Sequence, residues 1–303
     1  MLVQRREVRM ESSLRDFLMY MKDVKNVSQN TLLSYKNDIA KLFRHLNKQN
    51  ITDVGKISET SLNSYVLHME RNGMSPATVS RNIASIKAFT FYLIKKGKLH
   101  QDPTERMKSP KVEKKPPHTL TLEEVNRLLE MPKTDNIKGI RDKAMLELLY
   151  ATGIRVSELI SLKVEDINMK SHYIVCCGSK NERIIPFGSM AGKALDNYFQ
   201  HGREEFLKEK ESDICFMNVS GEPMSRQGFW KIIKAYGNSA GITHEITPQI
   251  LRHSFALHML ENGADVASIQ ELLGHTDAAT AQVYLGNRSK KIRDVYMGAH
   301  PRA

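Results

Sequence analysis

The sequence predicts a mainly α-helical protein of two domains, with a small antiparallel β hairpin in the second. Apolar residues recur every three or four positions through most of the 303 residues, which is the spacing that gives a helix one buried face. Residues with high β propensity gather in one short stretch, at 172–186. Prolines and lysines interrupt the helices at 108–118. We therefore expect domains at residues 1–107 and 119–303, joined by an extended linker at 108–118.

Four amphipathic helices are expected to form the first domain. The first should cover residues 12–25, after a frayed stretch at 1–10. The last has the clearest start signal, with Ser75 as the N-cap and Pro76 at the first helical position, where its missing N–H is not needed. No strand-like alternation appears among these residues, so the first domain is expected to be a compact all-α unit.

The second domain should combine helices with the hairpin. Thr121 and Glu124 have the spacing of a capping box and indicate a helix start. The hairpin pairs residues 172–177 with 183–186 around a turn at 178–182. The remaining expected elements are helices at 136–150, 191–208, 226–240 and 289–297, with a short strand at 214–216.

The positive charge is concentrated in the first domain and the linker. The chain has 45 Lys and Arg against 34 Asp and Glu, a net charge of +11. Residues 1–118 contain 22 basic and 11 acidic residues, whereas residues 119–303 contain 23 of each. A basic module joined to a neutral one favours a polyanion as the partner, although a solubilising surface would have the same composition. The linker, at ~3 Å per residue, is long enough to reach across a DNA duplex.

Cysteines and apolar runs indicate the compartment. Cys176, Cys177 and Cys215 have neither the spacing of a metal site nor that of a disulfide framework. No apolar run approaches the ~20 residues that a membrane span requires, and no signal-peptide pattern follows the N-terminal arginines. We expect a cytoplasmic protein, in a reducing environment, that is not bound to a membrane.

Candidate chemistry is concentrated between Thr247 and Tyr284. Capping residues divide this segment into three short helices, the second of which ends at Gly274. Arg252 and His275 lie near helix ends, and Tyr284 follows one short helix later. A cation, an imidazole and a phenol held in this way suit chemistry on a phosphate group.

Several motifs follow one another along the chain. They are Ala-Thr-Gly-Ile-Arg-Val-Ser-Glu-Leu at 151–159, Ile-Leu-Arg-His-Ser-Phe-Ala at 250–256, Leu-Leu-Gly-His-Thr-Asp at 272–277, and a tyrosine nine residues after that last histidine. Together they closely resemble the tyrosine recombinases of the phage integrase family. The ending Ala-His-Pro-Arg-Ala resembles the Xer branch, which resolves chromosome dimers. The resemblance covers nearly the whole chain and implies a SAM-like DNA-binding domain and an α-rich catalytic domain that close around DNA.

The resemblance also implies a site-specific recombinase that cuts and rejoins one strand of each duplex at a time. Tyr284 would attack the phosphodiester, form a 3′-phosphotyrosine and free a 5′ hydroxyl. Because the ester keeps the bond energy, rejoining needs no ATP. Arg155 and Arg252 would hold the anionic phosphate through bidentate hydrogen bonds and replace a metal ion. No cofactor is expected, and the histidines form no zinc motif.

Four further residues have roles in this site. Glu158 would orient Arg155, although an i,i+3 surface pair is the alternative. Lys180 would protonate the leaving 5′ oxygen; it lies in a turn that departs from the commoner Gly-Lys-Gly form, and a merely exposed lysine is the alternative. His275 would donate a hydrogen bond to phosphate. Gln249 replaces the histidine that usually helps take the tyrosine's proton. Either the enzyme works more slowly, with the proton going to water, or Gln249 marks a weakened or engineered protein.

The remaining expectations concern partners. Duplex DNA carrying a specific recombination site is the expected substrate, bound by four protomers on two duplexes, either identical or including a partner recombinase. The C-terminal helix around 292–296 would pack into a neighbouring protomer. The candidate DNA contacts in the first domain are Lys25, Ser34, Lys36, Thr78, Arg81 and Lys87.

Two alternatives share most of these features. A type IB topoisomerase would use the same arginines, lysine, histidine and tyrosine to relax supercoils without exchanging strands. A non-catalytic DNA-binding protein would bind duplex DNA without forming a covalent adduct, and Gln249 would then be a sign of decay. The retained Arg155, Arg252, His275 and Tyr284 favour an active recombinase.

Overall fold

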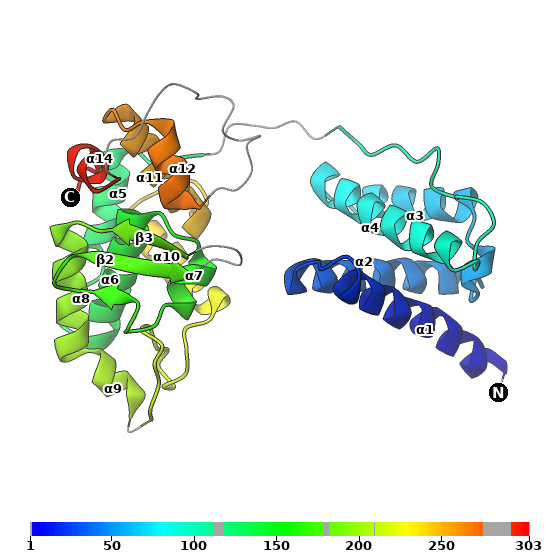
Figure 1. Ribbon diagram of the computed structural model, residues 1–303, viewed down its shortest axis with the longest axis horizontal. Coiled ribbons are helices and arrows are strands. Elements are labelled where there is room, and N and C mark those ends of the chain that lie inside the picture. The colour runs from blue at the N-terminus through cyan, green and yellow to red at the C-terminus, as the bar shows by residue number, and fades with distance from the viewer. Residues whose placement is uncertain (1, 112–117, 178–181, 209, 275–291, 303) are drawn as a thin grey trace. The chain divides into compact units, whose positions relative to one another are not determined.

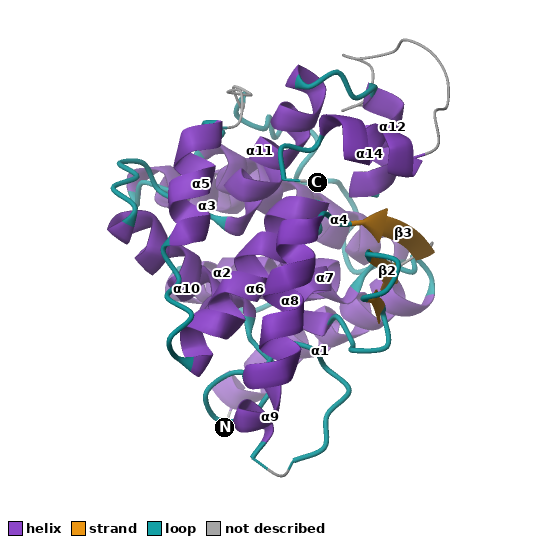
Figure 2. Cartoon of the chain, turned by 90° about the vertical axis from the view of Figure 1, so that its left-hand side faces the viewer, coloured by secondary structure: helices purple, strands orange, loops and turns teal. Residues whose placement is uncertain are grey.

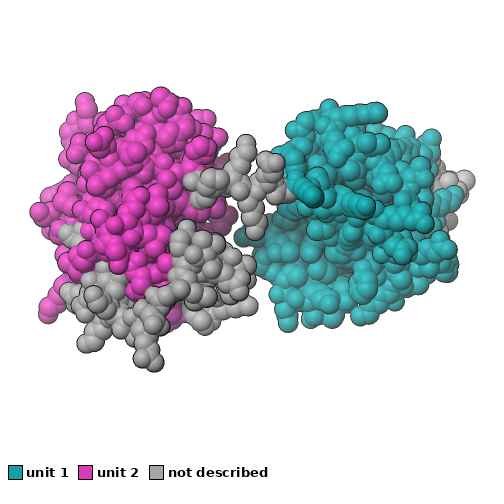
Figure 3. Space-filling model, turned by 90° about the horizontal axis from the view of Figure 1, so that it is seen from above, with its two compact units in different colours: residues 1–115 teal, residues 116–303 magenta. Residues whose placement is uncertain are grey.

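The computed structural model describes residues 2–111, 118–177, 182–208, 210–274 and 292–302. The chain forms two compact units, Met1–Lys115 and Pro116–Ala303 (Figure 3). Each unit has its own hydrophobic core. Figure 2 shows that helices make up most of the described chain. The predicted mainly helical fold class is therefore confirmed.

Four α-helices and a short 3-10 helix build the first unit (Figure 1). They are α1 (Leu2–Asp23), α2 (Gln29–Lys48), η1 (Val54–Lys56), α3 (Glu59–Arg71) and α4 (Pro76–Lys95). The side chain of Ser75 accepts a hydrogen bond from the backbone N–H of Thr78 and Pro76 opens α4, as the sequence predicts. The expectation of a frayed stretch at 1–10 was wrong, because α1 already begins at Leu2.

Aromatic side chains hold the core of the first unit together. Phe17 of α1 packs edge-on against Phe89 of α4, with the ring centroids 5.3 Å apart, and neither side chain is exposed. One carboxylate, that of Asp38 on α2, is also buried in this unit. It forms an ion pair with Arg81 of α4, so a charged residue is accommodated where α2 and α4 pack together.

The second unit contains nine described helices and a three-stranded sheet. The helices are α5 (Leu122–Glu130), α6 (Ile137–Thr152), α7 (Val156–Ser161), α8 (Ser189–His201), α9 (Arg203–Leu207), α10 (Arg226–Ser239), α11 (Pro248–Glu261), α12 (Val266–Leu273) and α14 (Ile292–Ala299). The strands β1 (Ile167–Asn168), β2 (Tyr173–Cys177) and β3 (Glu182–Pro186) are antiparallel in the order β1-β2-β3. The predicted hairpin is present, whereas β1 was not predicted.

Helix α6 is the centre of the second unit. It is buried on nearly all sides and packs against α5, α8 and α11, among other elements. Gly153 ends it in the left-handed conformation, with φ +60°. The turn that follows carries Ile154 and Arg155, and so the end of the core helix sets the position of the first arginine motif.

Two predicted elements of this unit are different in the structure. The helix expected at 191–208 is divided at Gly202 into α8 and α9. A Cβ at position 202 would lie 2.9 Å from a ring carbon of Tyr198, so the close packing there requires a glycine. The strand expected at 214–216 is only an isolated bridge between Lys163 and Ile214. Among the described residues, no helix is both long and apolar enough to cross a lipid bilayer.

Candidate active site

Three arginines from different elements meet at the C-terminal end of α12. Each donates a hydrogen bond to one of three successive backbone carbonyls. The pairs are Arg183 Nε with Leu272 at 2.9 Å, Arg252 Nη2 with Leu273 at 2.7 Å, and Arg155 Nη2 with Gly274 at 3.1 Å. The last carbonyls of a helix lack partners within the helix and carry partial negative charge. The end of α12 therefore holds the three guanidinium groups close together.

Arg155 is the most accessible of the three arginines. It is the N-cap residue of α7, and Glu158 in the first turn accepts a hydrogen bond from its backbone N–H at 2.7 Å. The Glu158 carboxylate also accepts one from Arg155 Nη1 at 3.2 Å. The Arg155 side chain remains 45% exposed, so part of this guanidinium faces solvent where an anion can approach.

Arg252 is buried beside it. Its Nη1 donates to the carbonyl oxygen of Gly153, which joins α11 to the end of α6. Burial, followed by the nearby charge of Arg155, lowers the pKa of Arg252 to about 10. That value still leaves Arg252 charged at neutral pH. The structure thus brings the two predicted arginines to one place, although one comes from the turn after α6 and the other from α11.

Glu158 is shared by two arginines and is not an ordinary surface partner of one. Arg183 binds it in a bidentate manner, with Nη1 to Oε1 at 2.9 Å and Nη2 to Oε2 at 2.8 Å. Although burial acts to raise the pKa of Glu158, the hydrogen bonds from Arg183 and Arg155 outweigh it, and the pKa is lowered. Glu158 is therefore a carboxylate at neutral pH, with 12% of its side chain exposed.

Arg183 was missed by the sequence analysis. It lies in β3 opposite Cys176 of β2, and its side chain is only 11% exposed, whereas the neighbouring Ile184 is 61% exposed. Hydropathy alone would predict a buried Ile184 and an exposed Arg183. The signal that could have found Arg183 is alternation along the strand, since Arg183 falls on the same face as the fully buried Ile185.

Comparisons with known proteins show the family of this chain. Residues 118–291 match the phage integrase family, and residues 14–97 match the N-terminal SAM-like domain of phage integrases. Tyrosine recombinase XerD of Oceanobacillus iheyensis is 41% identical over 297 residues, which cover 97% of this chain and 100% of the relative. The chain belongs to the phage integrase family.

Further relatives support the same assignment. Tyrosine recombinase XerD of Halalkalibacterium halodurans is 40% identical over 294 residues, covering 96% of this chain and 98% of the relative. The crystal structure of the XerH site-specific recombinase bound to difH substrate, a pre-cleavage complex, has the same fold, with a TM-score of 0.73 at 20% identity over 93% of this chain and 94% of that one. The protein is thus an Xer-like tyrosine recombinase, from a family of metal-independent enzymes that cut and rejoin DNA strands.

Three predicted catalytic residues of this recombinase, Lys180, His275 and Tyr284, lie outside the described residues. Their described neighbours are nevertheless part of the arginine cluster. Gly274 directly precedes His275, and Arg183 follows Lys180 by three positions in the same hairpin. Among the described residues, no group of three or more His, Cys, Asp or Glu side chains is placed to hold a metal ion.

Gln249 lies on the helix that carries the second arginine. It is the second residue of α11, after the capping Thr247 and Pro248, and it is exposed. Since residues three apart share one side of a helix, Gln249 occupies the same side as Arg252. Two histidines further along α11 are placed differently. His253 is half-buried, and His258 is buried and hydrogen-bonded to the hydroxyl of Tyr150.

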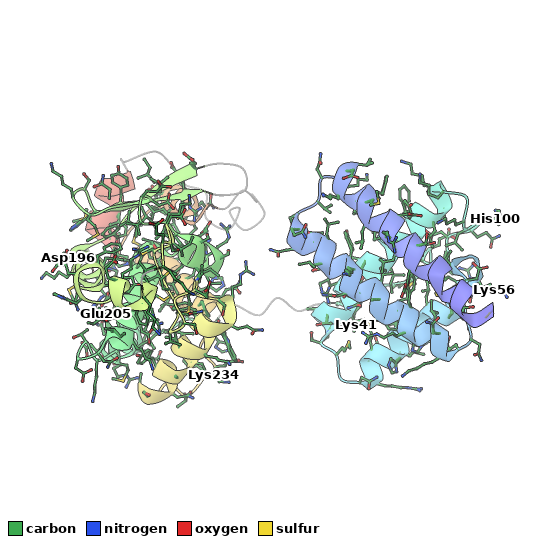
Figure 4. The ribbon with its side chains drawn as sticks, turned by 90° about the horizontal axis from the view of Figure 1, so that it is seen from below. Lys41, Lys56, His100, Asp196, Glu205 and Lys234 are labelled. Atoms are coloured by element: carbon green, nitrogen blue, oxygen red, sulfur yellow. The ribbon has the colours of Figure 1, made fainter. Side chains whose placement is uncertain are left out.

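The predicted DNA contacts of the recombinase all belong to the first unit, and they differ in their surroundings. Lys25, Lys36 and Lys87 are exposed, as is Lys56 of η1 (Figure 4). The hydroxyl of Ser34 donates to the carbonyl of Asn30, and that of Thr78 lies 2.9 Å from the Ser75 hydroxyl. Arg81 alone among the six has a buried ionic partner in the structure, Asp38.

Helix α14 packs on its own unit, against α11 and α12. The ring of Tyr296 is fully buried, and its hydroxyl accepts a hydrogen bond from the backbone N–H of Gly188 at 3.0 Å. His300 stacks on Tyr296 with the ring centroids 4.8 Å apart. The sequence predicts that this helix packs into a neighbouring protomer, whereas in the structure the loop before α8 and His300 cover the Tyr296 ring within the same unit.

Proposed function

We propose that Tyr284 is the nucleophile of this recombinase and that Arg155 and Arg252 bind the phosphate it attacks. The observation that carries this proposal is the convergence of both guanidinium groups on the last carbonyls of α12. The chain from Gly274 leads through His275 to Tyr284, so the segment bearing the phenol starts at that cluster. Charged donors fixed in advance around a phosphate stabilise the additional negative charge of the transition state.

The chemistry follows from these groups. The Tyr284 oxygen attacks phosphorus, the bond from phosphorus to the 5′ oxygen breaks, and the DNA 3′ end is held as a phosphotyrosine. A phenol has a pKa of about 10, so nearby positive charge must favour the phenolate. Lys180 delivers a proton to the departing 5′ oxygen, and His275 donates to a phosphate oxygen. Gln249 donates a hydrogen bond through its amide but cannot act as a base.

The first unit would bind duplex DNA with its excess positive charge. Exposed lysines such as Lys25, Lys36 and Lys87 provide contacts to phosphates, which set the register without reading sequence. Ser34 and Thr78 would add hydroxyl contacts. Arg81 is the strongest candidate for reading a base, because a paired carboxylate fixes its guanidinium. The segment 108–118 would connect the two units around the duplex.

The assembly follows from the reaction. Exchanging strands between two duplexes requires four cuts, so four protomers, either identical or including a partner recombinase, would hold two recombination sites. The role in the cell would be resolution of chromosome dimers in the cytoplasm, on the nucleoid. The XerH structure was solved with its difH substrate, which supports a dedicated DNA site for the present chain as well.

A suicide substrate tests the chemistry. The duplex would carry a site selected by this protein from random sequences, with a nick placed so that cleavage releases a short fragment and traps the adduct. The wild type is expected to give a covalent band that Tyr284→Phe does not give. The absence of this band from the wild type would overturn the proposal and favour a DNA-binding protein without catalysis.

A plasmid assay separates recombination from topoisomerase activity. A recombinase resolves or inverts a plasmid with two sites and leaves a plasmid with one site unrecombined. Relaxation of supercoils at equal rates on both plasmids, without exchange products, would contradict recombination and indicate a type IB topoisomerase.

A further inference from the structure

Arg183 directs three hydrogen bonds into the protein. Two go to the Glu158 carboxylate, at 2.9 and 2.8 Å, and the third goes to the carbonyl of Leu272 at 2.9 Å. With 11% of its side chain exposed, Arg183 presents little surface to a substrate. It is therefore placed to act on DNA through its neighbours and not by direct contact.

The negative charge of Glu158 explains what Arg183 contributes to the site. A carboxylate that accepts from Arg155 also repels a phosphate and cancels part of the attraction that Arg155 exerts. Arg183 pairs with the same carboxylate in bidentate geometry, which is the strongest form of this interaction. Without Arg183, Arg155 would be the principal cation left on Glu158. With it, Glu158 can fix the backbone of Arg155 and leave that residue's charge available.

The same side chain connects the β hairpin to the arginine cluster. Arg183 pairs across the sheet with Cys176, and it reaches both α12, through Leu272, and α7, through Glu158. Its guanidinium lies so close to Gly274 that a Cβ there would be 3.0 Å from it, in a backbone with φ +63°. The hairpin that carries Lys180 is thus fixed to the helix end from which the segment of His275 and Tyr284 begins.

We propose that Arg183 is a positioning residue of the recombinase. It neutralises Glu158, so that Arg155 keeps its charge for the phosphate, and it holds the hairpin of Lys180 against α12. This inference rests on the proposed function of Arg155 and Lys180. It assigns to the strand arginine an effect on the cleavage step that a purely structural contact between β3 and α12 would not have.

The test is a double-mutant cycle on single-turnover cleavage of the suicide substrate. Arg183→Gln is expected to slow covalent adduct formation by about 10- to 100-fold, the order of loss that misplaced reacting groups cause. DNA affinity should change by less than about threefold, since Arg183 does not contact the duplex. Adding Glu158→Gln to Arg183→Gln removes the unpaired carboxylate but keeps an oxygen for the Arg155 N–H, and it should restore most of the rate. Arg183→Lys should fall between the wild type and Arg183→Gln.

Three controls make the result decisive. Thermal unfolding of each variant separates loss of fold from loss of rate, and the double variant tests the inference even if Arg183→Gln alone folds poorly. Arg226→Gln removes the same charge from an exposed position in the same unit and should leave the rate unchanged. An active wild type with a double variant no faster than Arg183→Gln overturns this inference and leaves the proposed function intact. A wild type that forms no adduct overturns both.

Discussion

Gly153 and Phe255 are in such close contact that no side chain fits between them. A Cβ at Gly153 would lie 2.4 Å from Cδ1 of Phe255, and the residue has φ +60°. The carbonyl of Gly153 also accepts a hydrogen bond from Nη1 of Arg252. The end of α6, the core of α11 and the second arginine are therefore fixed at one point, two residues before Arg155.

Gly153→Ala should destabilise the second unit and slow cleavage. The left-handed conformation costs an alanine about 1–2 kcal/mol, and overpacking against Phe255 adds about 1–3 kcal/mol. Thermal or urea unfolding measures this loss. Gly241→Ala is the matched control, because Gly241 has φ +69° but no atom within 4 Å of an added Cβ, so only the backbone term applies. Equal losses in the two variants would show that the contact with Phe255 is unimportant.

Arg302 anchors the end of the chain through a buried carboxylate. It donates two hydrogen bonds to Glu147 and a third to Asn126, and the Glu147 side chain is 1% exposed. Arg302→Met should cost about 3 kcal/mol, because it leaves a buried carboxylate with Lys143 as its remaining ion-pair partner. Adding Glu147→Gln should recover part of the loss.

Chemical unfolding provides the measurement for this pair. The exposed pair of Lys210 and Glu222 is the control, and Lys210→Met should cost less than about 1 kcal/mol. If Arg302→Met proved as mild as Lys210→Met, the ion pair at the chain end would contribute no more than a surface pair.

His300 should make stability depend on pH. Its Nε2 donates to the carbonyl of Tyr150, its Nδ1 accepts from the backbone N–H of Arg302, and burial lowers its pKa to about 4. The unfolded chain, with a pKa near ~6.5, therefore binds more protons than the folded protein between these values. Stability is fully present above about pH 6.5 and falls as the pH drops toward 4, by an order of 2–3 kcal/mol.

His300→Gln should flatten this dependence, because it removes the titrating ring and keeps an N–H for Tyr150. Free energies of unfolding measured between pH 4.5 and 7.5 give the slope. His201→Gln, at an exposed position ending α8, should leave the slope as in the wild type. Burial also lowers the pKa of His258, so some slope should remain in the His300 variant.

Gln249→His should accelerate cleavage. An imidazole on the same side of α11 as Arg252 can take a proton near neutral pH, which an amide cannot do. A general base typically contributes 10²-fold or more, so an increase of at least about tenfold is expected, with a new titration in the pH–rate profile. Gln249→Asn keeps an amide and should show neither effect. An unchanged rate in the histidine variant would mean that proton removal from the tyrosine does not limit cleavage.

Local signals in the sequence predicted much of the fold. Ser75 with Pro76, and Thr121 with Glu124, open helices in the structure as their capping patterns indicate. Such signals are local, since they depend on residues within one turn of a helix. The break at Gly202 was not predicted, although the ring of Tyr198 that a Cβ there would meet lies only one helix turn earlier in the sequence.

The site was predictable only where its residues belong to a motif. Arg155 and Arg252 were found by motif and meet in the structure. Arg183 was not, because nothing adjacent in sequence explains why a strand buries an arginine and exposes Ile184. The partners that stabilise Arg183, Glu158 and the end of α12, come from elsewhere in the chain. Alternation with the buried Ile185 could have placed Arg183 on the inner face of β3, but it could not have identified these partners.

The buried carboxylate of Asp38 holds Arg81, which is the candidate base-reading residue of the first unit. Its Oδ2 accepts from Arg81 and from the hydroxyl of Ser85 at 2.8 Å, while its buried Oδ1 has no hydrogen-bond partner among the residues that the structure describes. The Arg81 side chain is 47% exposed, so the carboxylate fixes a guanidinium whose outer part faces solvent. An arginine fixed in this way suits bidentate recognition of guanine in the major groove.

Asp38→Asn should therefore weaken discrimination more than affinity. Releasing Arg81 should lower the ratio of specific to non-specific binding about tenfold, in line with the 1–3 kcal/mol of one good base contact. The added positive charge should meanwhile strengthen non-specific binding at low salt. Asp16→Asn makes the same charge change at an exposed partner of Lys98 and should alter only the non-specific term. Binding selections from random duplexes, run in parallel for the two variants and the wild type, measure specific and non-specific binding. If Asp38→Asn and Asp16→Asn selected the same sequences as the wild type, Arg81 would be a phosphate contact and not a reader of bases.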